Sequence, residues 1–207
     1  CQQRTGFRPM RASFLLLIAL ISAYNMAESI EEPAYTTIAI VDGVELRRYE
    51  PGIQARTTLA SSGQTNSGFR RLAGFIFGGN DRDMKIAMTA PVEETLEPEP
   101  TMAFTMPSEY RMADLPAPDD GEVELVAVPA RTVAVLAFSG WATGGKVADR
   151  TEELLQTLQA QGIPVVGPPS LNQYDARWTL PFMRRNEIMV GIGAIPDSIL
   201  EGDHTDH

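Results

Sequence analysis

Cysteine and histidine, two side chains often used as nucleophiles, general bases and metal ligands, are almost missing from this sequence. The only cysteine is Cys1, and the two histidines, His204 and His207, lie in an acidic C-terminal tail. A disulfide framework, a cysteine zinc site and a thiol nucleophile are therefore excluded from the body of the protein. We expect the tail to be flexible and expect no metal site in it.

Glu187 and Tyr174 are the residues that could serve as a general acid and base. The sequence shows no set of nucleophile, base and orienting residue around them. A small-molecule hydrolase therefore remains the least favoured alternative, and we predict a protein that is not an enzyme.

Aromatic and cationic side chains gather in two segments. In the first, Arg71 and Phe75 are i, i+4 neighbours on a helix face separate from its apolar stripe, with Arg70 alongside. The second segment, residues 174–185, contributes a larger set: Tyr174, Trp178, Phe182, Arg184 and Arg185. Each of these residues would also suit a solvated surface or a packed loop, so only their convergence favours a binding site.

The first half of the chain must position the earlier segment. Residues 53–59 alternate between apolar and polar, which predicts a half-buried strand. A helix capped by Ser67 follows, with an inward stripe of Phe69, Leu72, Ala73 and Ile76. Residues 85–92 then predict a buried strand that carries Met88 on the same face as Ile86 and Ala90, and that ends at Pro91.

The second half repeats this order. A buried strand at 133–138 precedes a helix whose apolar residues are all predicted to face inward: Val147, Thr151, Leu154, Leu155 and Leu158. Three prolines, at 164, 168 and 169, are predicted to break the chain before a last strand at 188–192. Two strand–strand–helix–strand–strand units at an offset of roughly 80 residues predict an internal duplication with a cleft near its pseudo-twofold axis.

The 207 residues suffice for one domain behind a leader. With 27 acidic and 17 basic residues the formal net charge is −10. Such an acidic surface disfavours nucleic acid and anionic lipid as partners of the body of the protein.

The leader has the pattern of a secretory signal. Arg11 precedes a short apolar run, residues 14–21, and Ala27 is a suitable residue for cleavage. We expect Met10 to be the initiator, residues 1–27 to be upstream residues plus signal peptide, and the protein to be periplasmic or secreted. A retained N-terminal anchor is the alternative. The remaining chain is expected to form one domain at 28–195 and a flexible acidic tail at 196–207.

Several motifs together resemble the SOUL/haem-binding protein family over about residues 32–192. They are Lys85-Ile86-Ala87-Met88-Thr89-Ala90-Pro91-Val92, Phe104-Thr105-Met106-Pro107-Ser108-Glu109-Tyr110, Pro116-Ala117-Pro118, Phe138-Ser139-Gly140, Gln173-Tyr174-Asp175 and Arg184-Arg185-Asn186-Glu187. The resemblance implies an α+β fold of duplicated ββαββ halves: a distorted antiparallel barrel or sheet with two packed helices, as in bacterial effector-binding domains.

The resemblance also implies non-covalent binding of haem or another tetrapyrrole between the first helix and a loop late in the second half. At those positions the site residues would be Arg70, Arg71, Phe75, Met88, Tyr174, Trp178, Phe182, Arg184 and Arg185. The body of the protein has no histidine, so a histidine axial ligand is excluded. The expected role is a carrier, buffer or scavenger outside the cytoplasm. The alternative is a module for a cationic amphiphile, with Glu187 as the buried counter-charge.

Overall fold

A computed structural model describes residues 30–176 and 178–201. The predicted leader, the second half of the predicted acidic tail and the two histidines lie outside these residues. The compact unit that holds the site begins at Glu31. No helix of the described part is both long enough and apolar enough to span a membrane.

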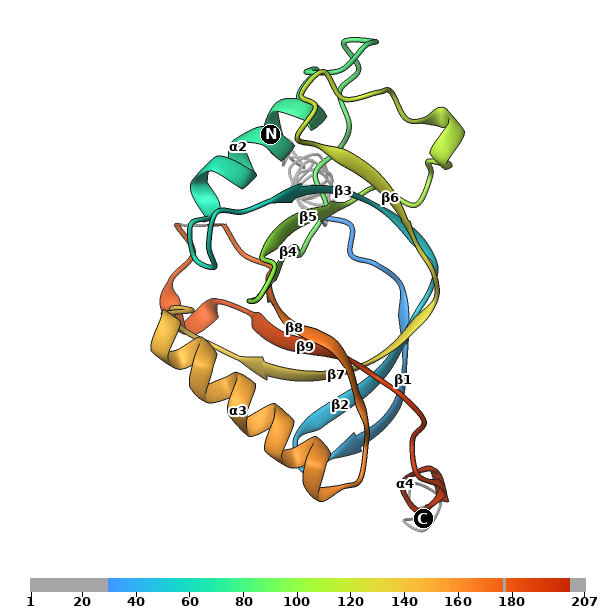
Figure 1. The fold of residues 1–207 in the computed structure, drawn as a ribbon, viewed down its shortest axis with the longest axis vertical. Coiled ribbons are helices and arrows are strands. Elements are labelled where there is room, and N and C mark those ends of the chain that lie inside the picture. The colour runs from blue at the N-terminus through green and yellow to red at the C-terminus, as the bar shows by residue number, and fades with distance from the viewer. Residues whose placement is uncertain (1–29, 177, 202–207) are drawn as a thin grey trace, which may run out of the picture. The chain divides into compact units, whose positions relative to one another are not determined.

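Nine antiparallel strands form one curled sheet (Figure 1). The strands are β1 (Tyr35–Val41), β2 (Val44–Tyr49), β3 (Gly52–Thr58), β4 (Val92–Thr95), β5 (Thr101–Thr105), β6 (Glu124–Val128), β7 (Arg131–Phe138), β8 (Val165–Gln173) and β9 (Asn186–Ile192). Their order across the sheet is β1-β2-β7-β9-β8-β4-β5-β3-β6. The predicted α+β class is confirmed.

Two long helices pack on this sheet (Figure 1). Helix α2 (Thr65–Ile76) contacts β3 and β5, and helix α3 (Gly144–Ala160) contacts β7, β8 and β9. The short helix α4 (Asp197–Glu201) lies against β1, and single 3₁₀ turns occupy Met112–Asp114 and Pro181–Met183. The first residues of the predicted flexible tail are thus helical, and Ile199 packs on the core.

The sheet has an approximate twofold symmetry of topology. Exchanging β2 with β6, β3 with β7, β4 with β8 and β5 with β9 reproduces the order of these eight strands read from the opposite edge of the sheet. The same exchange relates α2 to α3, and β4 and β8 pair with each other at the centre. This is the arrangement that two ββαββ halves predict, although a duplication of the sequence itself stays a prediction.

Three local predictions were wrong. Residues 85–91 form no strand: the Ile86 N–H donates to the Ile76 carbonyl and the Ala90 N–H to the Glu31 carbonyl, so no strand ladder forms there. The prolines at 168 and 169 do not break the chain, because a register shift between Val166 and Ser170 accommodates them within β8. Helix α2 starts at Thr65, two residues before the predicted cap.

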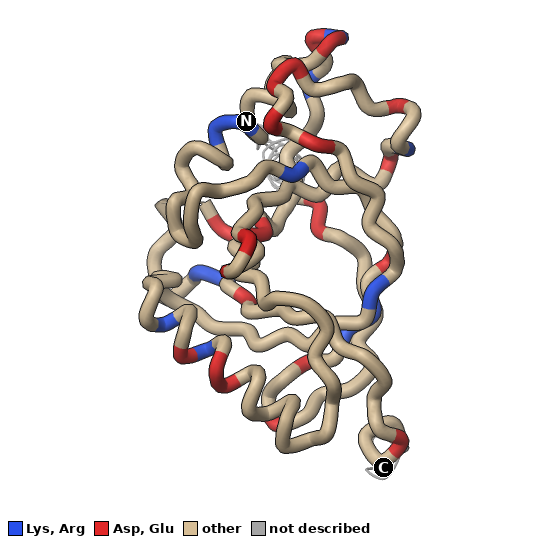
Figure 2. The backbone as a smooth tube through the Cα atoms, in the orientation of Figure 1, with Lys and Arg blue, Asp and Glu red and all other residues tan. Residues whose placement is uncertain are grey.

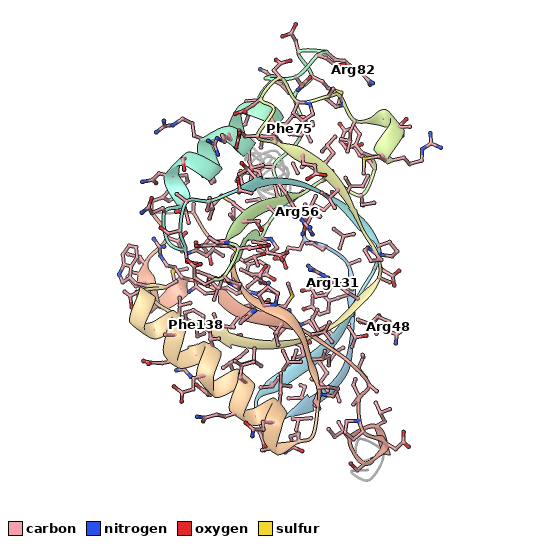
Figure 3. All side chains as sticks on the ribbon, viewed as in Figure 1. Arg48, Arg56, Phe75, Arg82, Arg131 and Phe138 are labelled. Carbon is pink, nitrogen blue, oxygen red and sulfur yellow. The ribbon has the colours of Figure 1, made fainter. Side chains whose placement is uncertain are left out.

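The inner side of the curl is polar. Arg56 and Arg131 point into the space that the sheet encloses (Figure 3). Arg131 forms an ion pair with Glu93 at 3.1 Å, and Gln54 donates to the same carboxylate at 3.0 Å while it accepts from Arg56. The apolar core therefore lies mainly under the helices: one buried cluster includes Leu72 of α2 and another includes Leu154 of α3.

Candidate functional site

The candidate site is a cleft between α2 and α3 with a volume of about 1320 Å³. Its floor comes from the neighbouring strands β5, β4 and β8, where the two halves of the sheet meet. The position follows from the topology: each helix covers its own half of the sheet, so the central strand pair is left open between them.

Strand alternation selects the floor residues. On β4 and just after it, Val92, Glu94 and Leu96 line the cleft, whereas Glu93 faces the polar interior of the curl. Glu94 pairs in register with Met102 of β5 and with Leu171 of β8, and both of these side chains also line the cleft. Around Glu94 the floor is thus apolar, and the amide of Gln173 adds a second polar group at the end of β8.

The walls come from the two helices. Helix α2 contributes Thr65 and Phe69. The Phe69 ring packs edge-on against the Phe104 ring, with 5.4 Å between the ring centroids. The wall from α3 is a row at i, i+4, i+8: Val147, Thr151 and Leu155. The sequence predicted that this row packs into the core together with Leu154 and Leu158; only the latter two are fully buried. The apolar stripe of α3 is therefore shared between core and cleft.

A buried carboxylate marks one part of the floor. Glu94 is 5% exposed and accepts one hydrogen bond, at 2.6 Å from the Gly63 N–H. Burial raises the pKa of the Glu94 carboxyl above its ordinary value, and the Gly63 hydrogen bond acts in the opposite direction. The Ser62 Oγ, next to Gly63, is buried and has no hydrogen-bond partner among the residues that the structure describes.

An arginine and a tryptophan lie at another part of the lining. The Arg184 guanidinium carbon lies 3.9 Å from the centroid of the Trp141 ring, and Arg184 Nε donates to the Thr179 carbonyl at 2.9 Å. Trp141 is 54% exposed, so part of its surface is free to contact a ligand. Asp175 and Gln173 complete this region of the lining.

Four of the predicted site residues belong to or follow α2, and none of them lines the cleft. Arg70 is exposed on α2, and Arg71 lies 4.0 Å from both Asp120 and Glu122. Phe75 is only 2% exposed, because it packs in the core under α2 (Figure 3). The prediction of an open Phe75 face was therefore wrong. Met88 is partly exposed in the irregular segment before β4.

Of the five predicted residues in the late segment, only Arg184 lines the cleft. Trp178 and Phe182 are 88% and 74% exposed. Arg185 stacks on the ring of Tyr174, with 3.7 Å between its guanidinium carbon and the ring centroid. These residues surround the loop that carries Arg184, but their side chains do not form the described walls.

Glu187 is held in a buried polar network away from the cleft. Arg47 donates to it at 2.9 Å, Tyr174 Oη at 2.7 Å and Arg185 Nε at 3.0 Å. Burial, and then the Glu187 charge, raise the pKa of the Tyr174 hydroxyl far above its ordinary value. Two arginines already balance Glu187, and it does not line the cleft. The predicted role of Glu187 as the pocket counter-charge is thus not supported.

Sequence reasoning missed most of the true lining. The α3 row was assigned to the core, and Glu94, which lies in a segment rich in glutamate and proline, was given no role. The spacing of Val92, Glu94 and Leu96, at every second residue, could have predicted a strand with these three side chains on one face. Within residues 30–176 and 178–201, no group of three or more His, Cys, Asp or Glu side chains is placed to hold a metal ion.

Comparison with known proteins gives a family match and a fold match. The family model of the SOUL heme-binding protein matches residues 30–191. Heme-binding protein 2 of Mus musculus is 28% identical over 182 residues, which is 78% of this chain and 85% of that protein. Heme-binding protein 2 of Homo sapiens is 30% identical over 129 residues, which is 57% of this chain and 62% of that protein.

Solved structures resemble the fold at low identity. The crystal structure of the EcmrR C-terminal domain has a TM-score of 0.58 at 10% identity, and the match covers 78% of this chain and 99% of that domain. The cryo-EM structure of an EcmrR–DNA complex also has a TM-score of 0.58, at 12% identity, and the match covers 88% of this chain and 65% of that one. At these identities the likeness concerns the fold alone.

Proposed function

This chain belongs to the SOUL heme-binding protein family, and from that premise we propose that it binds haem or a related tetrapyrrole in the cleft between α2 and α3. The observation that carries the proposal is the cleft itself. At about 1320 Å³ it exceeds the roughly 300–1000 Å³ of most small-molecule pockets, and the greater part of its lining surface is apolar. It therefore has room and surface for a macrocycle.

The side chains of this cleft fit a flat ligand with acidic substituents at one edge. Leu155, Val147 and Phe69 would contact the apolar ring, and burial of that ring would provide most of the binding free energy. Arg184 would pair with a propionate carboxylate, and the exposed part of Trp141 would pack beside it. A bound haem would supply light absorption and the redox chemistry of its iron.

The proposed role is non-enzymatic: a carrier, buffer or scavenger of tetrapyrrole. The signal peptide predicted within residues 1–27 would place that role in the periplasm or outside the cell. N-terminal sequencing of the protein recovered from cell fractions tests the location. A mature protein that starts after Ala27 in the exported fraction is the expected result, and an uncut protein in the membrane fraction would favour the retained anchor.

A titration with a blocked cleft tests the binding site. Ala148 is exposed on α3 and lines the cleft, so Ala148→Trp fills the cleft without disturbing the core. Ala160 is exposed at the end of the same helix outside the lining, so Ala160→Trp is the matched control. Haemin and metal-free protoporphyrin are added separately while absorbance and tryptophan quenching are followed.

We expect saturable binding to the unmodified protein and to Ala160→Trp, and at least about tenfold weaker binding to Ala148→Trp, which corresponds to roughly 1.4 kcal/mol. The absence of saturation with either tetrapyrrole would refute the function. Equal affinities of the two tryptophan variants would refute the site.

A second candidate ligand is an aromatic organic cation. Among the described residues, four carboxylates line the cleft, Glu94, Glu97, Glu152 and Asp175, and one cation, Arg184, lies with them. Acidic segments are visible between the two helices, around β4 (Figure 2). Competition between ethidium and protoporphyrin separates the two candidates: saturable ethidium binding to a protein that does not bind either tetrapyrrole would favour the cation.

A further inference from the structure

Two carboxylates are buried among the residues that the structure describes, and they differ in how their charge is balanced. Glu187 is paired with Arg47 and Arg185. Glu94 has no arginine or lysine within salt-bridge distance among the described residues, and its one hydrogen bond comes from a neutral backbone N–H. A buried ionised carboxylate without a cation is costly, so its presence at a binding surface indicates a partner that arrives with the ligand.

The place of Glu94 within the cleft supports this interpretation. It lies on β4, the central strand of the three that form the floor, between Met102 and Leu171. The other three cleft carboxylates, Glu97, Glu152 and Asp175, belong to exposed residues. Water screens an exposed carboxylate, whereas a buried one acts through a lower effective dielectric and interacts strongly with a charge on the ligand.

Tetrapyrroles differ in the charge at their centre. A porphyrin dianion with ferric iron has a net positive centre, whereas ferrous haem and a metal-free porphyrin are neutral there. A carboxylate oxygen is also a hard donor, which suits ferric iron better than the softer ferrous ion. An unpaired carboxylate in the floor therefore favours the ferric form, and nearby charge is among the factors that set the properties of a bound haem.

We propose that Glu94 supplies the negative charge that balances the iron centre of ferric haem, and that this carboxylate makes the cleft selective for ferric haem over ferrous haem and metal-free porphyrin. The inference rests on the proposed function, because it assumes that the cleft binds tetrapyrrole. The body of this protein has no histidine that could lie against the iron of a bound haem. The inference assigns that position to the Glu94 carboxylate of β4.

The test compares three probes: haemin, haemin reduced under argon, and metal-free protoporphyrin. Glu94→Gln removes the charge but keeps the size and an acceptor for the Gly63 N–H. Glu94→Asp keeps the charge but shortens the side chain, so it distinguishes an effect of charge from an effect of packing. Glu99→Gln is the control, since Glu99 is exposed in the loop after the same strand and does not line the cleft. Circular dichroism verifies the fold of each variant.

We expect Glu94→Gln to weaken haemin binding about tenfold or more and to change protoporphyrin binding by less than about twofold. The reduction potential of the bound haem should rise in Glu94→Gln and stay lower in Glu94→Asp and Glu99→Gln, because a negative charge stabilises ferric iron. Equal loss of affinity for haemin and protoporphyrin, or an unchanged potential, would overturn the role of Glu94 while leaving the cleft as the binding site. Failure of the unmodified protein to bind any probe would instead refute the proposed function together with this inference.

Discussion

Arg47 Nη1 donates to Glu187 Oε2 at 2.9 Å across 140 residues of sequence, and both side chains are almost completely buried. Arg47 lies on β2 and Glu187 on β9, and β7 pairs with both of these strands. Tyr174 and Arg185 extend the contact to the loop that carries Arg184. The network around Glu187 therefore links β2 and β9, the two strands that flank β7, to the loop that carries Arg184.

Loss of one partner of this pair should be strongly destabilising. Arg47→Met leaves part of the Glu187 charge uncompensated in the interior, and we expect the free energy of unfolding to fall by about 3 kcal/mol or more. Urea denaturation measures it. Glu153→Gln is the control, because its ion pair with Arg150 is solvent-exposed and should contribute less than about 1 kcal/mol. Similar losses in both variants would contradict the structural role.

Alkaline pH should reveal the Tyr174 hydrogen bond. The folded-state pKa of the Tyr174 hydroxyl is raised by burial and by Glu187, so its contribution to stability is complete below the unfolded value of about 10. It is lost as the pH rises above that value, because only the unfolded chain then releases the proton. Tyr174→Phe should lower stability at pH 8 by roughly 1.5–3 kcal/mol and flatten the decline above pH 10.

Tyr110→Phe provides the control for that series, since the Tyr110 hydroxyl makes no hydrogen bond to another described residue. Its urea denaturation curves should follow those of the unmodified protein at both pH values. An equally steep alkaline loss in Tyr174→Phe would mean that another group, such as the buried Tyr49, dominates.

Truncation to alanine should lower the free energy of unfolding much more at Phe75 than at Phe77. Phe75 packs in the α2 core, so Phe75→Ala should cost about 3–5 kcal/mol in thermal or urea unfolding. Phe77 ends the same helix and is 65% exposed, so Phe77→Ala should change stability by less than about 0.5 kcal/mol. If Phe75→Ala were as mild as Phe77→Ala, the residue would be a free ligand contact, as the sequence predicted.

The β8 bulge should make Gly191 intolerant of a side chain. A Cβ atom there would lie 2.6 Å from the Val166 carbonyl oxygen, a backbone atom that cannot move without shifting β8. Gly191→Ala should therefore cost about 1–3 kcal/mol. Gly52 on β3 meets no atom within 4 Å of an added Cβ, so Gly52→Ala should be close to neutral. Equal thermal midpoints would show that β8 is more flexible than its pairing indicates.

Sequence patterns were reliable for continuous apolar runs, which form strands that are buried along most of their length. The strand predicted at 133–138 lies within β7, and the last predicted strand lies within β9. The strand predicted at residues 85–91 was wrong because apolar side chains there, such as Ile86, are buried by a loop that packs under α2 and not by a strand. The opposite error occurred in β8, where the prolines at 168 and 169 predicted a break but a bulge accommodates them within the strand.

The sequence by itself determined the class of the fold, the family, and the exclusion of a histidine ligand from the body of the protein, because these depend on residue types and their order. Only the tertiary structure decided which residues line the cleft. Val147 and Leu154 are both apolar residues of α3, yet one faces the cleft and the other the core. Glu94 and Glu187 are both glutamates on strands, yet the sheet places Glu187 beside two arginines and places Glu94 beside none of the arginines that the structure describes. Those differences arise from contacts between segments that are far apart in the sequence, and the spacing of residues within one segment does not reveal such contacts.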